Sequence, residues 1–346
     1  MVTSMIHLYE KMKSGVYIIA EMSANHGGKL ETALKIVEEA KKAGADCLKI
    51  QTYTADTLTI PCHKPPFQIK GGLWDGYTYY DLYKKAYTPW EWQQTIKEKC
   101  EETGIDFLST PFDTTSVDFL EGIGIEFYKI ASFELVDIPL IEYIAKKGKP
   151  MILSCGMGSI EEIEEAISAC KKNGNEQIIL LKCCSQYPAE YENMNVSLIP
   201  DMKKRFNVPV GLSDHSLGSL ADIIAVSLGA KIIEKHVCLN KESESADIGF
   251  STEIKDFAKM VCDVENTLKI MGKGTYDLTQ QEKKEVQVRR SLFAVKDIKK
   301  GEKFTRENIR SIRPGDGLKP KYYAALLDKE AKQDYEYGDP IGSFEV

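Results

Sequence analysis

The 346-residue sequence predicts an α/β protein, a (β/α)8 TIM barrel followed by a small C-terminal domain. The first observation is that eight short apolar or β-branched runs recur along the chain, with helical periodicity between them. Parallel strands need such crossover connections, and eight units over about 250 residues suit a closed barrel better than an open sheet. The second observation is that this alternation stops after Gly274, which indicates a different domain.

The predicted strands follow one another at the spacing that helical crossovers require. They are residues 16–23, 47–52, 106–110, 127–131, 150–154, 178–184, 208–212 and 231–236. The first helix is predicted from the i, i+3, i+4, i+7 spacing of Leu30, Ala33, Leu34 and Val37, with Gly44 as its stop signal. No G-x-G-x-x-G motif follows the first strand, which argues against a dinucleotide-binding sheet.

The last barrel helix is predicted from the same spacing of Ile254, Phe257, Ala258 and Val261. Residues 53–89 are long for a strand-to-helix connection, and their prolines, glycines and tyrosines predict an ordered excursion over the barrel mouth. We therefore expect a barrel domain over residues 1–275, a polar linker over 276–289 and a small domain over 290–346. The small domain has short strand-like pieces, such as residues 291–295, and no long helix.

Composition excludes several classes of protein. Hydrophobic residues make up 43% and charged residues 28%, as in an ordinary soluble globular protein. A net charge of −7 supplies no overall field for nucleic acid or an anionic membrane, and no apolar run reaches the roughly 18 residues of a membrane span. The N-terminus lacks the apolar segment of a signal peptide. We expect a cytoplasmic protein with no nucleic-acid partner and no membrane partner.

Polar residues occur at the C-terminal ends of all eight predicted strands, where barrel enzymes place their reactive groups. Side chains two apart on a strand face the same side, so Lys49 and Gln51 are predicted to face the barrel mouth together. The same holds for Glu234 and His236. The other strand ends contribute Glu21, Thr110, Lys129, Ser132, Glu134, Ser154, Ser185, Tyr187, Ser213 and His215. Polar residues at all eight ends predict an active site.

The residue types at these ends indicate their ligands. Lys49 and Lys129, among several hydroxyls, offer the charge-assisted hydrogen bonds that phosphate and carboxylate groups need. His215 and His236, on neighbouring strands, are predicted to bind a divalent cation, with water and substrate in the other positions. Mixed nitrogen and oxygen coordination suits Mn²⁺, Co²⁺ or Mg²⁺. Asp214 is expected to point away from its neighbours and to cap the following turn.

These residues form a series that resembles the motifs of the sialic-acid (nonulosonic-acid) synthase family. The series runs through Glu21 with Asn25 and His26, Lys49-x-Gln51, STPF at 109–112, KIAS at 129–132, GLSDHS at 211–216 and EKH at 234–236. The tail resembles that family's antifreeze-like (SAF) domain through RSL at 290–292, KKGE at 299–302 and IRPG at 312–315. The likeness covers nearly the whole chain, so it implies the same two-domain fold.

Four stretches further resemble the branch of this family that makes pseudaminic acid. They are SANH at 23–26, QTYT at 51–54, IKGGLWD at 69–75 and LKC at 181–183. Ser185 stands where N-acetylneuraminate synthases have an Asn, two residues before the matching Tyr187. Cys184 replaces a Thr that both groups share.

The resemblance implies that phosphoenolpyruvate, 2,4-diacetamido-2,4,6-trideoxy-L-altrose and water give pseudaminic acid and phosphate. It implies that a metal on His215 and His236 polarises the sugar aldehyde, and that Glu21 activates or places the water. Lys49, Lys129 and Glu234 join Glu21 as catalytic candidates. Phosphate and carboxylate are expected on the two lysines with Thr110, Ser132, Ser154, Ser185 and Ser213, and the sugar on Gln51, Glu134, Tyr187, Asp247 and Arg313.

Because Arg313 belongs to the small domain, the family arrangement implies a domain-exchanged homodimer in which each barrel receives an arginine from its partner. Within the family, an N-acetylneuraminate or legionaminate synthase is the alternative, using N-acetylmannosamine or a 2,4-diacetamido-6-deoxymannose. A Schiff-base aldolase with Lys129 as nucleophile would be trapped by borohydride and indifferent to chelators, but it gives no reason for two strand-end histidines. A non-catalytic carbohydrate-binding protein would bind sugar without releasing phosphate.

Overall fold

The computed structural model describes residues 4–242 and 244–345. The chain divides into two compact units, Met1–Gly272 and Lys273–Val346, which are described here one at a time. The stretch that the sequence predicts to be a linker, 276–289, contains the short helix α13 (Gln280–Glu285). Among the described residues, no helix has the length and apolar character needed to cross a membrane.

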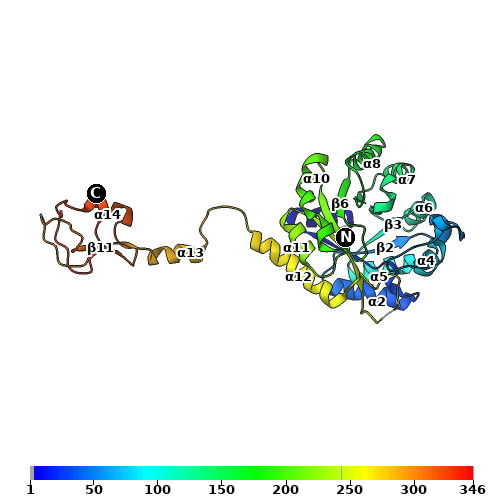
Figure 1. The fold of residues 1–346 in the computed structure, drawn as a ribbon, viewed down its shortest axis with the longest axis horizontal. Coiled ribbons are helices and arrows are strands. Elements are labelled where there is room, and N and C mark those ends of the chain that lie inside the picture. The colour runs from blue at the N-terminus through cyan, green and yellow to red at the C-terminus, as the bar shows by residue number, and fades with distance from the viewer. Residues whose placement is uncertain (1–3, 243, 346) are drawn as a thin grey trace. The chain divides into compact units, whose positions relative to one another are not determined.

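The first unit is a closed parallel barrel, which confirms the predicted fold class (Figure 1). Neighbouring strands pair in chain order, and β1 also pairs with β8, so the eight strands close into a barrel. The strands are β1 (Tyr17–Glu21), β2 (Cys47–Thr52), β3 (Asp106–Pro111), β4 (Tyr128–Ile130), β5 (Met151–Ser154), β6 (Ile178–Cys183), β7 (Val210–Asp214) and β8 (Ile232–Cys238). A two-residue strand, β9 (Thr252–Glu253), pairs with β8 and was not predicted from the sequence.

Helices surround this barrel, as Figure 1 shows. They are α2 (Leu30–Lys42), α5 (Trp90–Thr103), α6 (Thr114–Gly122), α7 (Ile138–Ala145), α8 (Ile160–Lys172), α10 (Ile199–Phe206), α11 (Leu220–Ser227) and α12 (Ile254–Met271). Three further helices lie in the connections between strands: α3 (Ala55–Leu58), α4 (Tyr79–Ala86) and α9 (Tyr191–Met194). The predicted spacings in α2 and α12 are confirmed, because Ala33, Val37, Phe257 and Val261 are all buried in the layer between helices and barrel.

Helix α1 (Ser4–Ser14) closes the N-terminal end of the barrel and was not predicted from the sequence. Its two buried residues, Leu8 and Met12, lie four apart and join the apolar cluster inside the barrel. Asp106 lies at the same end and accepts hydrogen bonds from the Tyr17 hydroxyl at 2.5 Å and from His7 Nδ1 at 2.7 Å. This end of the barrel is therefore sealed by packing and local hydrogen bonds.

The inside of the barrel changes character along its length. Its lower part is apolar and consists of Tyr17, Ile19, Cys47, Leu108, Phe127, Ile152, Ile179, Leu181 and Ile232. Gly211 faces this part, and a Cβ there would collide with the backbone carbonyl oxygen of Ile232 and lie 2.7 Å from Leu181 Cδ2, so only glycine fits. The upper part, at the C-terminal ends of the strands, carries the charged residues.

The second unit has its own small core. Strands β10 (Ser291–Ala294) and β11 (Ile309–Ile312) pair antiparallel, and α14 (Tyr323–Leu326) is a single short turn of helix. The buried side chains are Leu292, Ala294, Ile298, Phe304, Ile309, Leu318, Leu326, Ala331, Tyr335 and Ile341. The strand-like piece that the sequence predicts at 291–295 corresponds to β10.

Candidate active site

Four charged side chains meet inside the upper barrel. They are Glu21, Lys49, Lys129 and Glu234, and none is more than 4% exposed. The Lys49 ammonium contacts Glu21 and lies 3.4 Å from Glu234 Oε1, and Lys129 Nζ lies 3.9 Å from the same oxygen. The two ammonium groups are thus paired with carboxyl groups, which is the condition under which charge can be buried.

Hydroxyl groups from three further strands contact this cluster. Lys129 Nζ donates to Ser154 Oγ at 2.6 Å, and Lys49 Nζ donates to Thr110 Oγ1 at 3.4 Å. The Ser213 hydroxyl donates to Glu234 Oε1 at 3.3 Å. The structure thus brings the predicted lysines and three of the predicted hydroxyls together. Ammonium and hydroxyl donors converging on one point suit a phosphate or carboxylate group.

Two more predicted serines meet at a close approach of three strand ends. Gly156 N donates to Ser132 Oγ at 3.1 Å, and a Cβ on Gly156 would lie 2.8 Å from that oxygen and would also collide with Ser185 Oγ. Only glycine at position 156 leaves room for the hydroxyls of both Ser132 and Ser185 beside its backbone. Cys183, which the sequence did not single out, connects them to the next strand, with its sulfur 3.8 Å from His215 Nδ1.

The two predicted metal ligands are neighbours. The rings of His215 and His236 lie 5.3 Å apart between centroids. His215 Nδ1 is 2.9 Å from the carbonyl oxygen of Cys184 and donates to it, so in the neutral form of the ring Nε2 carries the lone pair. His236 Nδ1 is buried without a hydrogen-bond partner, and burial and the nearby cations hold the His236 pKa well below its usual value. A neutral imidazole is the form that binds metal.

Within residues 4–242 and 244–345, no group of three or more His, Cys, Asp or Glu side chains is arranged to hold a metal ion. The two histidines therefore fit as a pair of ligands only if water or substrate oxygens complete the coordination. That is the arrangement of an open, catalytic site.

The two carboxylates of the cluster differ in their protonation. Burial raises the pKa of Glu21 to about 7, although the Lys49 ammonium opposes this. Burial also acts against ionisation of Glu234, but Lys129 and Lys49 hold its pKa below the usual value. Glu234 is therefore charged, and Glu21 can gain or lose a proton near neutral pH. A pair of carboxyl groups separated in this way is typical of acid–base sites.

An aromatic wall stands beside the histidines. Tyr187 lies 4.5 Å from the His215 ring and Phe250 lies 4.8 Å from the His236 ring, between centroids. Trp74, from the long excursion after β2, lies 5.8 Å from Tyr187 and donates its indole N–H to the Ala246 carbonyl at 2.8 Å. The sequence pointed to Tyr187 but missed Phe250 and Trp74 as site residues. Trp74 lies in the IKGGLWD stretch that carries the branch resemblance, whereas the only signal of Phe250 was its aromatic character in a long loop.

The remaining predicted residues lie in loops, near the end of β2 and in the second unit. Asp247 Oδ2 accepts from Ala24 N at 3.4 Å in the loop after β1, and burial raises the Asp247 pKa. Gln51 is half-buried near the end of β2. Glu134 lies in the turn Ser132–Val136 after β4, where burial raises its pKa to about 7. Arg313 is exposed and follows β11 in the second unit, so its part in the site stays a prediction.

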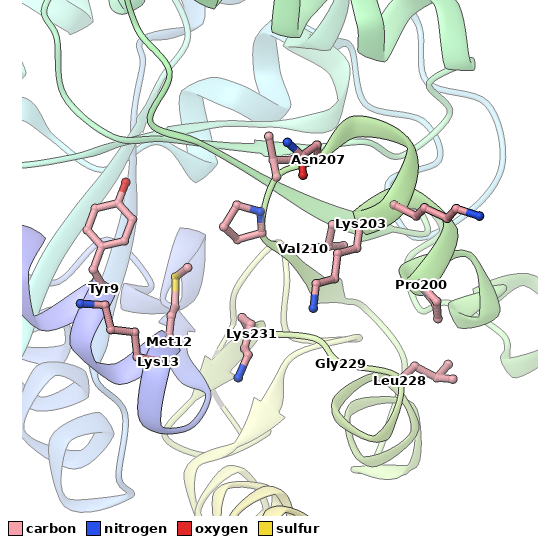
Figure 2. Close-up of a pocket in the computed structure, with 13 residues that line it drawn as sticks. Tyr9, Met12, Lys13, Pro200, Lys203, Asn207, Val210, Leu228, Gly229 and Lys231 are labelled. Atoms are coloured by element: carbon pink, nitrogen blue, oxygen red, sulfur yellow. The ribbon is translucent and has the colours of Figure 1, made fainter.

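A cavity of about 750 Å³ lies at the opposite end of the barrel (Figure 2). Tyr9 and Met12 of α1 line it, together with Lys203 of α10, Pro209 before β7 and Lys231 before β8. All the candidate site residues of the barrel lie at or beyond the other ends of the strands. The candidate active site is therefore the upper barrel, not this cavity.

Comparison with known proteins gives one consistent result. The NeuB family model matches residues 36–276 and the SAF domain model matches 289–342. The chain is 48% identical to a pseudaminic acid synthase from Campylobacter jejuni, covering 94% of this chain and 95% of that one, and 39% identical to one from Helicobacter pylori, covering 95% and 97%. It also resembles the crystal structure of an N-acetylneuraminic acid (sialic acid) synthetase from Leptospira borgpetersenii, with 35% identity, a TM-score of 0.70 and coverage of 79% and 90%.

Proposed function

This chain belongs to the NeuB family, and we propose that it condenses phosphoenolpyruvate with 2,4-diacetamido-2,4,6-trideoxy-L-altrose and water to give pseudaminic acid and phosphate. The observation that carries the proposal is the 48% identity, over 94% of the chain, to a relative with this name. The similarity to the N-acetylneuraminic acid synthetase is lower, at 35%. The balanced charge cluster beside two histidines supports a reaction between an anionic substrate and an aldehyde.

Lys49 and Lys129 would bind the phosphate and carboxylate of phosphoenolpyruvate. Their ammonium groups already converge with the hydroxyls of Thr110 and Ser154, so the donors are oriented before the substrate arrives. Glu234 lies near both ammonium groups, and its negative charge offsets the repulsion between them. Negative charge entering this site is therefore met by fixed positive groups in a dry environment.

His215 and His236 would hold the divalent cation, and Mn²⁺, Co²⁺ and Mg²⁺ all suit nitrogen ligands completed by oxygen. When bound, such a cation supplies Lewis-acid polarisation of the sugar's aldehyde oxygen. The aromatic wall of Tyr187, Phe250 and Trp74 stands beside the two histidines and would limit the access of bulk water to the reacting carbonyl.

Glu21 would act on the water. Carbon–carbon bond formation leaves positive charge on the former enol carbon, and water adds there as it loses a proton. A carboxyl group whose pKa is near 7 can accept that proton at neutral pH, and the Lys49 ammonium beside it stabilises the charged form. Phosphate then leaves from the same carbon.

The test is phosphate release from phosphoenolpyruvate with Mn²⁺, measured for the altrose derivative, the legionaminic precursor and N-acetylmannosamine, each with and without EDTA. Release that needs the altrose derivative and is abolished by EDTA is the expected result. Release with another of the sugars would keep the family chemistry and overturn the sugar assignment. Borohydride trapping with chelator-resistant activity would instead support the Schiff-base alternative through Lys129.

We also propose that the active form is a homodimer in which Arg313 completes the site of the other subunit, as the family likeness implies. Mixing two inactive variants, Glu21→Gln and Arg313→Ala, tests this. If arginine is exchanged between subunits, a mixed dimer contains one site with neither substitution, and activity returns on mixing. If each subunit uses its own Arg313, every site carries one defect and mixing restores nothing.

A further inference from the structure

A second group of buried charges lies on the outer face of the strands that carry the histidines. Lys235 on β8 contacts the carboxylate of Asp214 on β7, and its Nζ lies 3.4 Å from Asp222 Oδ2 on α11. The same ammonium donates to the Ser216 carbonyl at 2.9 Å. All four residues are buried. Within the described residues, no hydrogen bond or ion pair joins them to the charge cluster inside the barrel.

The register of β7 and β8 places this group between two pairs that face the barrel interior. Ser213 is paired with Glu234, and Asp214 with Lys235. His215 and His236 are the next residues after Asp214 and Lys235 along the sequence. Because side chains alternate along a strand, the first and third pairs share the inner face and the middle pair faces outward. The outward ion pair of Asp214 and Lys235 therefore directly precedes the two histidines along the sequence.

We infer that Asp214 and Lys235 are positioning residues that set the separation of His215 and His236 for the metal. The Lys235 ammonium holds the side chain of Asp214 and the carbonyl of Ser216, which are the residues on either side of His215. Asp214 Oδ1 also accepts from Ser216 N at 2.8 Å, closing the turn around that histidine. Lys235 itself directly precedes His236, so one ammonium fixes the backbone beside both imidazoles.

The inner face offers less to hold these rings. His215 has a hydrogen bond to the Cys184 carbonyl, whereas His236 Nδ1 has no partner. A metal site needs its ligands held within about 0.5 Å of the productive geometry. The ion pair of Asp214 and Lys235, which we call the outward clamp, supplies that restraint through the backbone. It faces away from the barrel interior, so it contacts neither metal nor substrate. This inference rests on the proposed function, because it assumes that the two histidines bind the cation.

Two isosteric variants separate positioning from simple stabilisation. Asp214→Asn leaves Lys235 beside Asp222, and Asp222→Asn leaves it beside Asp214, so each variant retains one carboxyl group next to the ammonium. Only Asp214→Asn loosens the contact beside His215. The dissociation constant for Mn²⁺ is measured on each purified protein by electron paramagnetic resonance, and unfolding is followed in EDTA. We expect Asp214→Asn to raise that constant by about 10-fold to 100-fold, and Asp222→Asn by much less.

Equal changes in the two variants, or no change in folded Asp214→Asn, would overturn the inference. If Asp214→Asn does not fold, Asp214→Glu, which keeps the charge but lengthens the side chain, takes its place with the same expected direction. His236→Ala is the control and must abolish Mn²⁺ binding; if it does not, the clamp has no metal to serve and the inference is wrong. The binding assay needs no turnover, so a failure of the proposed sugar reaction is detected separately by phosphate release.

Discussion

The lower and upper halves of the barrel interior are built from the same strands and have opposite properties. The lower half is a cluster of aliphatic and aromatic side chains, closed by Leu8 and Met12 of α1. The upper half holds four buried ionisable groups, and Glu21 Oε1 and Glu234 Oε2 have no hydrogen-bond partner within the described chain. On β8 the change takes two residues, from Ile232 to Glu234.

This difference separates stability from function. Apolar burial stabilises the fold by roughly 25 cal/mol for each Å² removed from water, and the lower half contributes in this way. Buried ions contribute little net stability even when paired, because desolvation offsets their attraction. The upper half is therefore a region that folding alone would not favour. Substitutions in the two halves should affect different measurements.

The largest expected effect is that of Glu21→Gln on catalysis. The amide keeps the size of the carboxyl group but cannot accept a proton, so phosphate release should fall by about 10²-fold to 10⁴-fold. The free energy of unfolding should not fall, because the variant removes a buried ionisable group. Glu10→Gln on the exposed face of α1 is the control and should leave both unchanged. Activity within tenfold of the unmodified protein would exclude Glu21 as the proton acceptor.

Phe127→Ala should show the opposite behaviour. Phe127 is fully buried in the lower half, with its ring 6.4 Å from that of Tyr17 between centroids. Its truncation leaves a cavity, so urea denaturation should show a loss of about 3–5 kcal/mol in the free energy of unfolding. Below its transition the variant should keep its KM for phosphoenolpyruvate. A raised KM without loss of stability would show that the two halves are not separable.

The pH dependence of stability should come from the upper half. The Glu21 pKa is about 7 in the folded protein against 4.5 ordinarily, so the folded state retains its proton while the unfolded state has lost it. Stability therefore falls as the pH rises from about 4.5 to about 7, by up to about 3 kcal/mol for this group, and then levels off. Denaturation in EDTA at pH 5 and pH 8 should show this fall relative to Glu21→Gln. A constant difference between the two proteins would contradict it.

The sequence predicted the barrel because both halves of each strand leave a local signal. Apolar runs mark the strands, and polar residues at their ends mark the site. The pairs Lys49 with Gln51 and Glu234 with His236 followed from alternation alone. Helix α1 has only two buried residues, so its pattern was too weak to predict.

Other contacts depend on distances that no local pattern contains. The contact between Lys49 on β2 and Glu234 on β8 requires the barrel to close between β1 and β8. The packing of Trp74 on Tyr187 joins two long loops that are more than a hundred residues apart. The outward clamp was predicted only in part. The sequence predicted that Asp214 points outward and caps a turn, but it did not predict the ion pair with Lys235.

The smallest effects should come from one strand that reaches both halves. Ile152 and Ser154 lie two apart on β5, one in the apolar cluster and the other accepting a hydrogen bond from Lys129 at 2.6 Å. Ile152→Val removes one methylene and should cost about 0.5–1.5 kcal/mol of stability with no change in KM. Ser154→Ala removes a hydrogen bond to a charged group, and KM for phosphoenolpyruvate should rise about tenfold. If both variants changed only stability, Ser154 would be a packing residue, and all of β5 would belong to the lower half.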